Sequence, residues 1–184
     1  MGRMALAQIT WQDVQQLPDD GNRYEAIEGE LYVTPAPSLR HQRISKRLER
    51  ALYALVEDSG LGEVLHAPVG VEFPATGEGV QPDILVISRA RSAILADPWV
   101  RGAPDFVIEI LSPTTARRDR EVKRKLYERQ GVQAYWIVDP EAAAVEVWSF
   151  GEEPSFQRFT EALPVRLMGE ECGDMDLAEI FRPG

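Results

Sequence analysis

Residues 105–111, Asp-Phe-Val-Ile-Glu-Ile-Leu, form one of the two apolar runs that decide the fold, and Ile84-Leu-Val-Ile87 is the other. Runs this short and apolar predict central strands that are buried on both faces of a sheet. Each carries one acid, Glu109 inside the first and Asp83 at the start of the second. A buried carboxylate is costly without a cation, a hydrogen-bond network or a metal ion. On adjacent strands the two acids would converge and could chelate a hard cation such as Mg²⁺, and a structural ion pair at each acid is the alternative.

Outward from these strands, the pattern predicts helices around a mixed sheet. Apolar spacings of three and four indicate a helix over 38–58, and a basic helix is expected over 116–130. Residues 23–34 predict a hairpin that turns at Glu28-Gly29. The other expected elements are a capped helix after Thr10, strands at 63–67, 69–73, 134–138 and 145–150, one or two strands in 155–168, a glycine-rich turn at 77–79, a loop with a short helix at 88–103, and a short helix at the acidic end. This order predicts a single domain over 1–184 with an α/β fold, or α+β, on one mixed sheet.

Composition excludes several classes of protein. The chain has 184 residues, one cysteine and two histidines, so it has no intrachain disulfide and too few Cys and His side chains for a zinc site of four such ligands. The longest apolar run, residues 51–56, is far shorter than the ~20 residues of a membrane span. We therefore expect a soluble cytoplasmic protein with no membrane partner and no secretory signal. The sequence contains no P-loop and no serine-hydrolase elbow.

Charge is distributed unevenly along the chain. The net charge is −10, which by itself disfavours nucleic acid as a partner. Residues 40–50, however, hold five cationic side chains against one acid, and residues 112–130 hold seven against three. Each of the two stretches therefore has a net charge of +4, and the rest of the chain has a net charge of −18. They are either solvated helix faces or an electrostatic footprint for a phosphate backbone, with Arg40, Arg117 and Arg118 as candidate contacts.

The predicted basic helix carries a polar stripe. Asp119, Lys123 and Tyr127 are spaced by four residues and therefore share one helix face. One interpretation is a surface salt bridge capped by a tyrosine. The other is that Lys123 projects toward the two strand acids, where it could orient an attacking water and stabilise charge on a phosphoryl group.

The ordered set of motifs resembles the Uma-type family of restriction endonucleases, within the PD-(D/E)xK nuclease superfamily. The pieces that carry the resemblance cover roughly residues 10 to 150: Tyr24-Glu-Ala-Ile-Glu-Gly-Glu30, His41 with Ile44, Pro82-Asp83, Val107-Ile-Glu-Ile-Leu-Ser-Pro113, Asp119, Lys123, Tyr127 and Gly131-Val-Gln-Ala-Tyr-Trp-Ile-Val-Asp-Pro140. Each piece is weak alone, and the ordered set is specific. The resemblance implies a restriction-endonuclease-like core of helix, three strands, helix and strand, here with an N-terminal hairpin and extra C-terminal strands.

The resemblance also implies a metal site. Asp83 and Glu109 would hold a divalent metal, Mg²⁺ or Mn²⁺, with the Ile110 carbonyl as a further ligand. Glu25 would be an extra ligand or a structural partner of the basic helix. His41 would contact phosphate or be an ordinary histidine on a helix.

One position departs from the superfamily pattern. The lysine expected two residues after Glu109 is Leu111 in this chain. In the family this role passes to the following helix, which makes Lys123 the candidate. Lys125 is the alternative, although it lies off the polar stripe that ends at Tyr127. Tyr127 is counted, with His41, among the candidate substrate-binding residues.

The sequence thus predicts a metal-dependent endonuclease that hydrolyses DNA, with Asp83, Glu109 and Lys123 as its catalytic residues. A non-cleaving nucleic-acid-binding module with the same fold is one alternative. A protein-interaction domain, in which the strand acids merely pair with Lys123 and Arg124, is another. Superfamily relatives often pair to cut two strands, so a homodimer is expected, with the strands near 143–168 as its interface.

Overall fold

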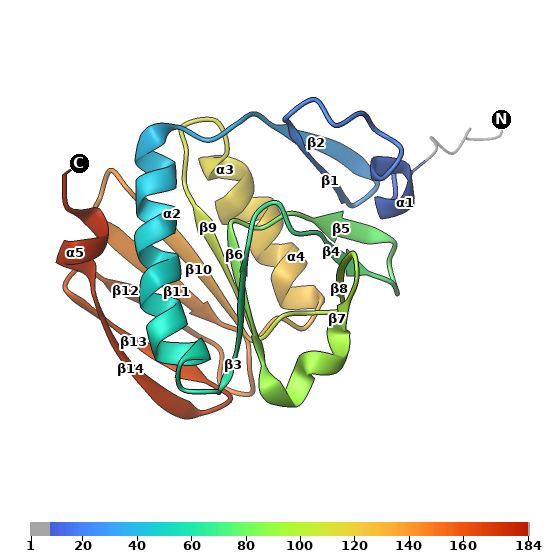
Figure 1. The fold of residues 1–184 in the computed structure, drawn as a ribbon. Coiled ribbons are helices and arrows are strands. Elements are labelled where there is room, and N and C mark those ends of the chain that lie inside the picture. The colour runs from blue at the N-terminus through green and yellow to red at the C-terminus, as the bar shows by residue number, and fades with distance from the viewer. Residues whose placement is uncertain (1–7, 184) are drawn as a thin grey trace, which may run out of the picture.

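The computed structural model describes residues 8–183 and has a six-stranded mixed sheet at its centre (Figure 1). The strand order is β12 (Ser155–Phe159), β11 (Ala144–Ser149), β10 (Ala134–Asp139), β9 (Phe106–Ile110), β6 (Ile84–Ser88) and β3 (Gly62–His66). Neighbours are antiparallel except β9 and β10, which are parallel. The two apolar runs are therefore adjacent central strands, and the predicted mixed α/β fold is confirmed.

A second sheet contains the N-terminal hairpin. Its order is β2 (Glu30–Thr34), β1 (Arg23–Ile27), β5 (Glu78–Val80), β4 (Val71–Phe73), β8 (Trp99–Arg101) and β7 (Leu95–Ala96). A third sheet pairs β13 (Ala162–Leu167) with β14 (Glu170–Asp176). The prediction of one mixed sheet is therefore wrong. Both edges of β6 are already paired, with β3 and β9, so the hairpin pairs with β5 instead.

Two segments predicted as irregular contain strands. Residues 78–80 form β5, which pairs with both β1 and β4. Residues 88–103 contain a 3₁₀ helix, Arg89–Ile94, and the short strands β7 and β8. Glycine near 77–79 suggests a turn, but Gly79 serves packing, because a Cβ there would lie 2.2 Å from the ring of Trp11. Trp11 begins α1 (Trp11–Val14), which carries the capping box that the sequence predicts.

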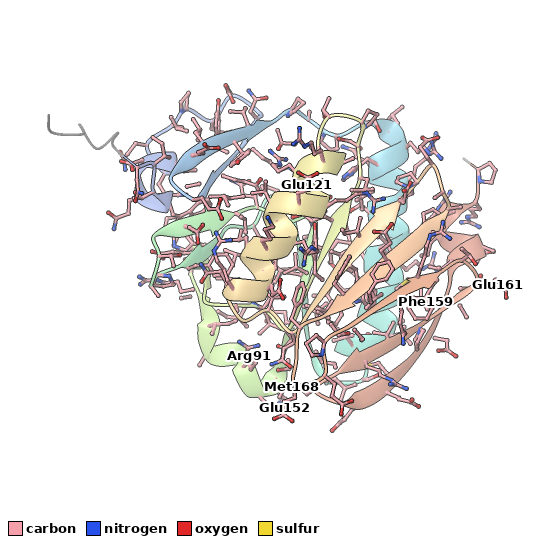
Figure 2. The ribbon with its side chains drawn as sticks, turned by 180° about the vertical axis from the view of Figure 1, so that it is seen from behind. Arg91, Glu121, Glu152, Phe159, Glu161 and Met168 are labelled. Carbon is pink, nitrogen blue, oxygen red and sulfur yellow. The ribbon has the colours of Figure 1, made fainter. Side chains whose placement is uncertain are left out.

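Two helical segments cover opposite faces of the central sheet (Figures 1 and 2). On one face, α2 (Leu39–Leu52) continues into a π-helical turn, Tyr53–Glu57. On the other face lie α3 (Ala116–Arg118), a π-helical turn at Asp119–Lys123, and α4 (Arg124–Arg129). The sequence predicts both segments over nearly these residues. The short α5 (Leu177–Phe181) packs beside α2. No helix within residues 8–183 is long and apolar enough to cross a membrane.

Successive side chains of β9 point to opposite faces of the central sheet, and Glu109 points to the face covered by α4. Ile108 belongs to the apolar cluster around α2, whereas Val107 belongs to the cluster around α4 that contains Leu126. Because successive side chains point to opposite faces, Glu109 lies on the α4 side with Val107. Burial of each such apolar side chain contributes about 1.5–3 kcal/mol. The buried residues before and after Glu109 in β9, Ile108 and Ile110, therefore fix its backbone position.

Candidate functional site

The register of β6 and β9 brings the two strand acids to the same end of the strand pair. Ile84 pairs with Ile108 in antiparallel orientation, so Asp83 and Glu109 are the next residues on their strands. The Ile110 N–H donates a hydrogen bond to Asp83 Oδ2 at 2.8 Å and ties this carboxylate to β9. Both acids are almost inaccessible, with exposed fractions of 4% for Asp83 and 3% for Glu109.

Glu109 accepts two hydrogen bonds from the helical segment that covers it. Lys123 Nζ donates to Glu109 Oε1 at 2.7 Å, and the Tyr127 hydroxyl donates to the same oxygen at 2.8 Å. The four-residue spacing places both donors on one side of the helical segment, as predicted for the polar stripe. Glu109 Oε2 accepts no hydrogen bond from residues 8–183. One carboxylate oxygen therefore remains available to a further ligand.

Lys123 is shared among three carboxylates. Besides its bond to Glu109, its Nζ lies 2.8 Å from Glu25 Oε1 and 4.0 Å from Asp119 Oδ1. Three atoms around it are buried without a hydrogen-bond partner in the structure: Glu25 Oε2, Asp119 Oδ1 and Arg118 Nε. Buried polar atoms of this kind cost free energy unless water or an ion satisfies them. The cluster therefore has spare capacity for a polar ligand.

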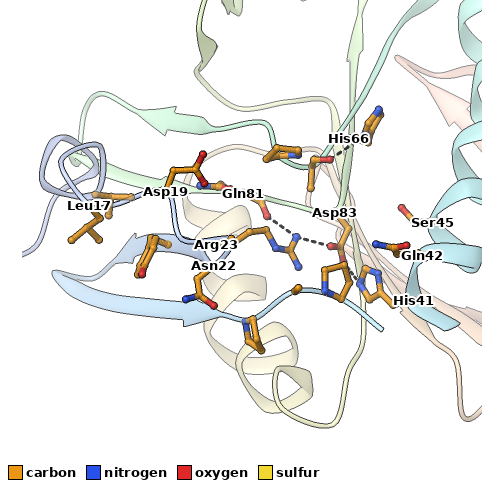
Figure 3. A pocket seen from close by; sticks show the side chains of 18 of the residues that line it. Leu17, Asp19, Asn22, Arg23, His41, Gln42, Ser45, His66, Gln81 and Asp83 are labelled. Carbon is orange, nitrogen blue, oxygen red and sulfur yellow. Dashed lines mark hydrogen bonds and ion pairs between the residues drawn. The ribbon is translucent and has the colours of Figure 1, made fainter. Parts of the chain in front are cut away.

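Asp83 is held from its other side by Arg23 and His41 (Figure 3). Arg23 Nη1 lies 2.6 Å from Asp83 Oδ1, and His41 Nε2 lies 3.0 Å from Asp83 Oδ2. Arg23 is the first residue of β1, and His41 lies in the first turn of α2. The Ser38 hydroxyl caps this helix by accepting a hydrogen bond from the His41 N–H. The cap therefore fixes the backbone position from which the His41 side chain extends.

The two strand acids have opposite electrostatic environments. Burial alone would raise the pKa of Asp83, but the hydrogen bond with His41 and the charge of Arg23 lower the pKa below its ordinary value. Burial raises the pKa of Glu109 to about 8. The charge of Asp83 also raises this pKa, whereas the charge of Lys123 lowers it. Adjacent carboxylates whose pKa values are pushed apart are typical of functional sites.

Lys123 stays charged despite its burial. Desolvation alone would lower the pKa of Lys123, but the carboxylates of Glu109, Glu25 and Asp119 raise it above the ordinary value. The side chain is therefore an ammonium at neutral pH, which donates hydrogen bonds and accepts none. Chemically it can stabilise negative charge or orient a water molecule, and it cannot serve as a base.

One cavity of about 200 Å³ joins these groups. Asp83, Glu109 and Lys123 all line it, and the segment 34–38 and the loop 112–115 supply further walls. Arg118 also lines the cavity and donates a hydrogen bond to Thr34 Oγ1 at 2.6 Å. The three residues that the sequence singles out therefore face one shared space. Their chemical roles are taken up below as a proposal.

Two arginines predicted as substrate contacts lie outside this cavity. Arg40 pairs with Glu141 and lines a separate surface hollow. Arg117 is 89% exposed and pairs with an acid one helical turn along the chain. Consecutive helical residues point about 100° apart, as 3.6 residues per turn requires. Since His41 and Arg118 face the cavity, their neighbours in sequence point elsewhere.

Tyr127 is also not a contact residue. It is fully buried, does not line the cavity, and uses its hydroxyl to position Glu109. Its prediction as a substrate-binding residue is wrong because its side chain is buried one turn beyond Lys123, where the stripe no longer lines the cavity. Of the two candidate lysines, Lys123 lines the cavity, whereas Lys125 is exposed.

Sequence reasoning missed Arg23. Arg23 and Glu25 are two residues apart in β1 and therefore point to the same side of the strand. Arg23 contacts Asp83, and Glu25 contacts Lys123. A pair of opposite charges at this spacing in a hairpin strand is the signal that could have revealed a cluster on that face.

The donor set suits a magnesium-type cation in kind and number. Mg²⁺ commonly takes one or two protein carboxylates, and substrate oxygens and water complete its octahedron. Glu109 Oε2 is available, and Asp83 Oδ1 accepts a hydrogen bond from Arg23 alone, so one of its lone pairs is available too. Within the described part of the chain, no three His, Cys, Asp or Glu side chains converge as a metal cage. The cavity therefore fits a cation that substrate oxygens help to bind.

Known proteins are similar to this chain in sequence and in fold. The chain is 24% identical over 147 residues to slr1290 of Synechocystis sp., an uncharacterised protein, and the match covers 76% of this chain and 70% of the relative. The fold is similar to a solved protein from Anabaena variabilis described as a "putative nuclease belonging to DUF820". The TM-score is 0.75 at 22% identity, over 94% of this chain and 97% of that one.

The family comparison covers the whole site. The model of the Uma2 family, described as "Putative restriction endonuclease", matches residues 11–172. This range includes every residue that lines the cavity between β6, β9 and the helical segment after β9. The chain therefore belongs to the Uma2 family.

Proposed function

We propose that this protein is a metal-dependent endonuclease that hydrolyses phosphodiester bonds of DNA. Membership of the Uma2 family supports a nuclease activity. The observation that carries the proposal is the shared cavity, where the carboxyl groups of Asp83 and Glu109 lie with the ammonium of Lys123. Two carboxylates for a cation and one fixed positive charge are the groups that this hydrolysis requires.

The two strand acids are the proposed ligands of Mg²⁺ or Mn²⁺, with the Ile110 carbonyl as a further ligand. When bound, the cation would polarise the scissile phosphate and lower the pKa of the attacking water. Glu25 is the other predicted ligand, but its Oε1 is bonded to Lys123 and to the Gln81 N–H. We therefore assign Glu25 to holding the lysine.

Lys123 supplies charge and orientation in this proposal. Because it is an ammonium, it stabilises the negative charge that develops on the phosphoryl oxygens and can donate a hydrogen bond to the attacking water. Tyr127 keeps Glu109 in position through its 2.8 Å hydrogen bond. Arg118, in the cavity wall, offers a planar guanidinium that suits a phosphate oxygen pair.

Arg23 and His41 hold the Asp83 carboxylate in place through an ion pair and a hydrogen bond. Both line the cavity, so both would lie beside a bound substrate. A guanidinium or imidazole N–H that Asp83 does not accept could contact a phosphate oxygen. His41 thus retains the phosphate-binding role that the family resemblance implies.

The test is nicking of supercoiled plasmid by the purified protein with Mg²⁺ or Mn²⁺. Wild type is expected to nick, and Asp83→Asn and Glu109→Gln are each expected to lower the rate by at least about 100-fold. Glu63→Gln is the matched control, because Glu63 is exposed on β3 outside the cavity. Equal nicking by Asp83→Asn would refute the proposed site. Salt-dependent DNA binding without product would favour a non-cleaving module, and loss of both would favour a protein-interaction domain.

A further inference from the structure

A second and larger pocket adjoins the cavity across Asp83 (Figure 3). Its volume is about 800 Å³. Arg23, His41 and Asp83 line both spaces, and residues 35–37 form a wall of each. A ligand group bound at Asp83 therefore continues directly into this pocket.

The lining of the larger pocket combines exposed apolar surfaces with free amides. Leu17 is 36% exposed, and Pro37 and Pro68 are exposed as well. The side-chain amides of Gln42 and Gln81 also line the pocket, and neither makes a hydrogen bond with another residue in 8–183. A nucleobase has the complementary chemistry, since its faces are apolar and its edges carry donors and acceptors. The volume also lies in the ordinary range for small-ligand sites, about 300–1,000 Å³.

The depth of the site restricts which DNA can reach it. Asp83, Glu109 and Lys123 are at most 4% exposed, beneath the segment 34–38. A phosphate that reaches them has to bring its neighbouring nucleotides into the adjoining pocket. A nucleotide inside a pocket cannot stay stacked and paired in a duplex, and extruding it costs a few kcal/mol. An unpaired nucleotide enters without that cost.

We propose that the larger pocket binds the base of an unpaired nucleotide next to the scissile phosphate. The preferred substrate class is therefore DNA with unpaired nucleotides, either a single strand or a duplex that contains an unpaired position. This inference rests on the proposed function in taking nucleic acid as the ligand. Arg23 and Lys46 are the cationic side chains of the lining, and the acids Asp19, Glu49 and Asp83 line the same pocket.

The experiment measures binding and cleavage separately. Binding is measured by fluorescence anisotropy in EDTA, so that no cleavage occurs. The probes are a paired duplex, the same duplex with one unpaired nucleotide, and that duplex with the unpaired base removed to leave an abasic sugar. Loss of one stacked base typically costs about 1–3 kcal/mol, so we expect the unpaired probe to bind about tenfold more tightly than the paired and the abasic probes.

Two pocket variants locate the effect. Ser45→Phe fills the pocket from α2, and Gln42→Ala removes an amide at an exposed helix position where folding is insensitive. Ser92→Phe is the control, since Ser92 is exposed and lines a different hollow. We expect Ser45→Phe to abolish the tenfold preference and Gln42→Ala to reduce it, with duplex binding unchanged within about twofold. Circular dichroism and thermal unfolding establish that each variant is folded.

The outcomes separate this inference from the proposed function. Equal affinity for all three probes, or an intact preference in a folded Ser45→Phe variant, overturns the inference. Cleavage of all three probes at one rate with no preference in binding overturns it too, while the nuclease proposal stands. A tenfold preference that Ser45→Phe abolishes, with no cleavage under any metal condition, supports the base pocket and contradicts the nuclease proposal.

Discussion

Lys123 joins more of the candidate site than any other side chain described above. Its Nζ lies within 4.0 Å of carboxylate oxygens of Glu25, Glu109 and Asp119, which come from three different elements. The residue is 2% exposed, so solvent does little to screen these charges. Removal of its charge leaves three buried acids without their shared positive partner.

Lys123→Met is therefore expected to lower the free energy of unfolding by about 3–5 kcal/mol, the usual cost of breaking a buried ion pair. Urea unfolding at pH 7 measures the change. Lys125→Met is the matched control, because Lys125 lies two residues away and is exposed, and a change within about 0.5 kcal/mol is expected. Equal destabilisation by the two variants would show that the buried cluster has no special role in stability.

At this scale the sequence reveals acids but not their partners. Asp83 and Glu109 stand out because each interrupts an apolar run, and Lys123 stands out from its spacing to Asp119. The contacts of Asp83 with Arg23 and His41 join residues about 60 and 42 positions apart. Such contacts depend on how the hairpin and α2 pack against the central sheet, and no local sequence pattern specifies this packing.

Among the elements, β5 connects the turn of the hairpin to the end of α4 through one carboxylate. Glu78 accepts the Glu28 N–H at 2.8 Å and the Gln130 Nε2 amide at 2.6 Å, and it pairs with Arg129. Burial alone would raise the pKa of Glu78, but the Glu28 N–H and the charge of Arg129 lower it below its ordinary value of 4.5. The ionised form therefore stabilises the fold.

The sign of the pH dependence follows from the lowered pKa. Stabilisation by Glu78 is complete above the unfolded value of 4.5 and is lost as the pH falls through the folded pKa. Glu78→Gln is expected to cost about 1–3 kcal/mol at pH 7, and its difference from wild type should shrink below about pH 4. Urea unfolding between about pH 3 and 7 tests this. The exposed Glu152→Gln is the control, and a difference that is constant with pH would contradict the assignment.

The contact of α1 with β5 gives a second prediction for the elements. A Cβ at Gly79 would lie 2.2 Å from ring atoms of Trp11. Gly79→Ala is therefore expected to lower the free energy of unfolding by about 1–3 kcal/mol, the usual cost of overpacking, and to change the tryptophan fluorescence. Gly151→Ala is the control, since its Cβ would meet nothing within 4 Å. A smaller loss for Gly79→Ala than for Gly151→Ala would contradict the packing argument.

Periodic elements are predicted best from this sequence. The two helical segments that cover the central sheet, and its strands β6 and β9, have apolar patterns long enough to identify from sequence. The hairpin turn at Glu28-Gly29 forms as expected. The short strands β5, β7 and β8 escape prediction because two or three residues carry no period. Their strand conformation comes from pairing with distant segments, such as Ala26 with Gly79.

The whole molecule is acidic, with local basic surfaces. One of these is the hollow between α2 and α5, which Arg40, Arg43, Arg47 and Arg182 line. Arg40 is paired with Glu141, Arg182 is paired with Glu179, and Arg47 donates hydrogen bonds to two backbone carbonyls. The Arg43 guanidinium has no ion-pair or hydrogen-bond partner within residues 8–183. Of these arginines, Arg43 is therefore the best placed to bind a phosphate. The predicted footprint on α2 shifts accordingly from Arg40 to Arg43.

If DNA follows this surface, Arg43→Gln lowers the slope of log K against log salt by about 1, since one phosphate contact is lost. Titrations of duplex DNA in EDTA over a range of salt concentrations measure the slope. Arg166→Gln is the control, because Arg166 pairs with Glu171 on the C-terminal sheet. The same slope for wild type and both variants would exclude this surface from the DNA path.

The expected homodimer stays a prediction. β12 is an edge strand of the central sheet, and its Phe156 is 49% exposed. Edge strands offer unpaired backbone groups to a second chain. The cytoplasmic location expected from the sequence is likewise untested.

The site draws on residues from Arg23 in β1 to Lys123 after β9, so its parts are synthesised a hundred positions apart. When only the hairpin and α2 have emerged from the ribosome, Asp83 and Lys123 have not yet been synthesised. On the proposed function, a nascent or truncated product cannot attack the genome of the cell that makes it. On that proposal, the catalytic groups come together only after the chain has been synthesised through Lys123.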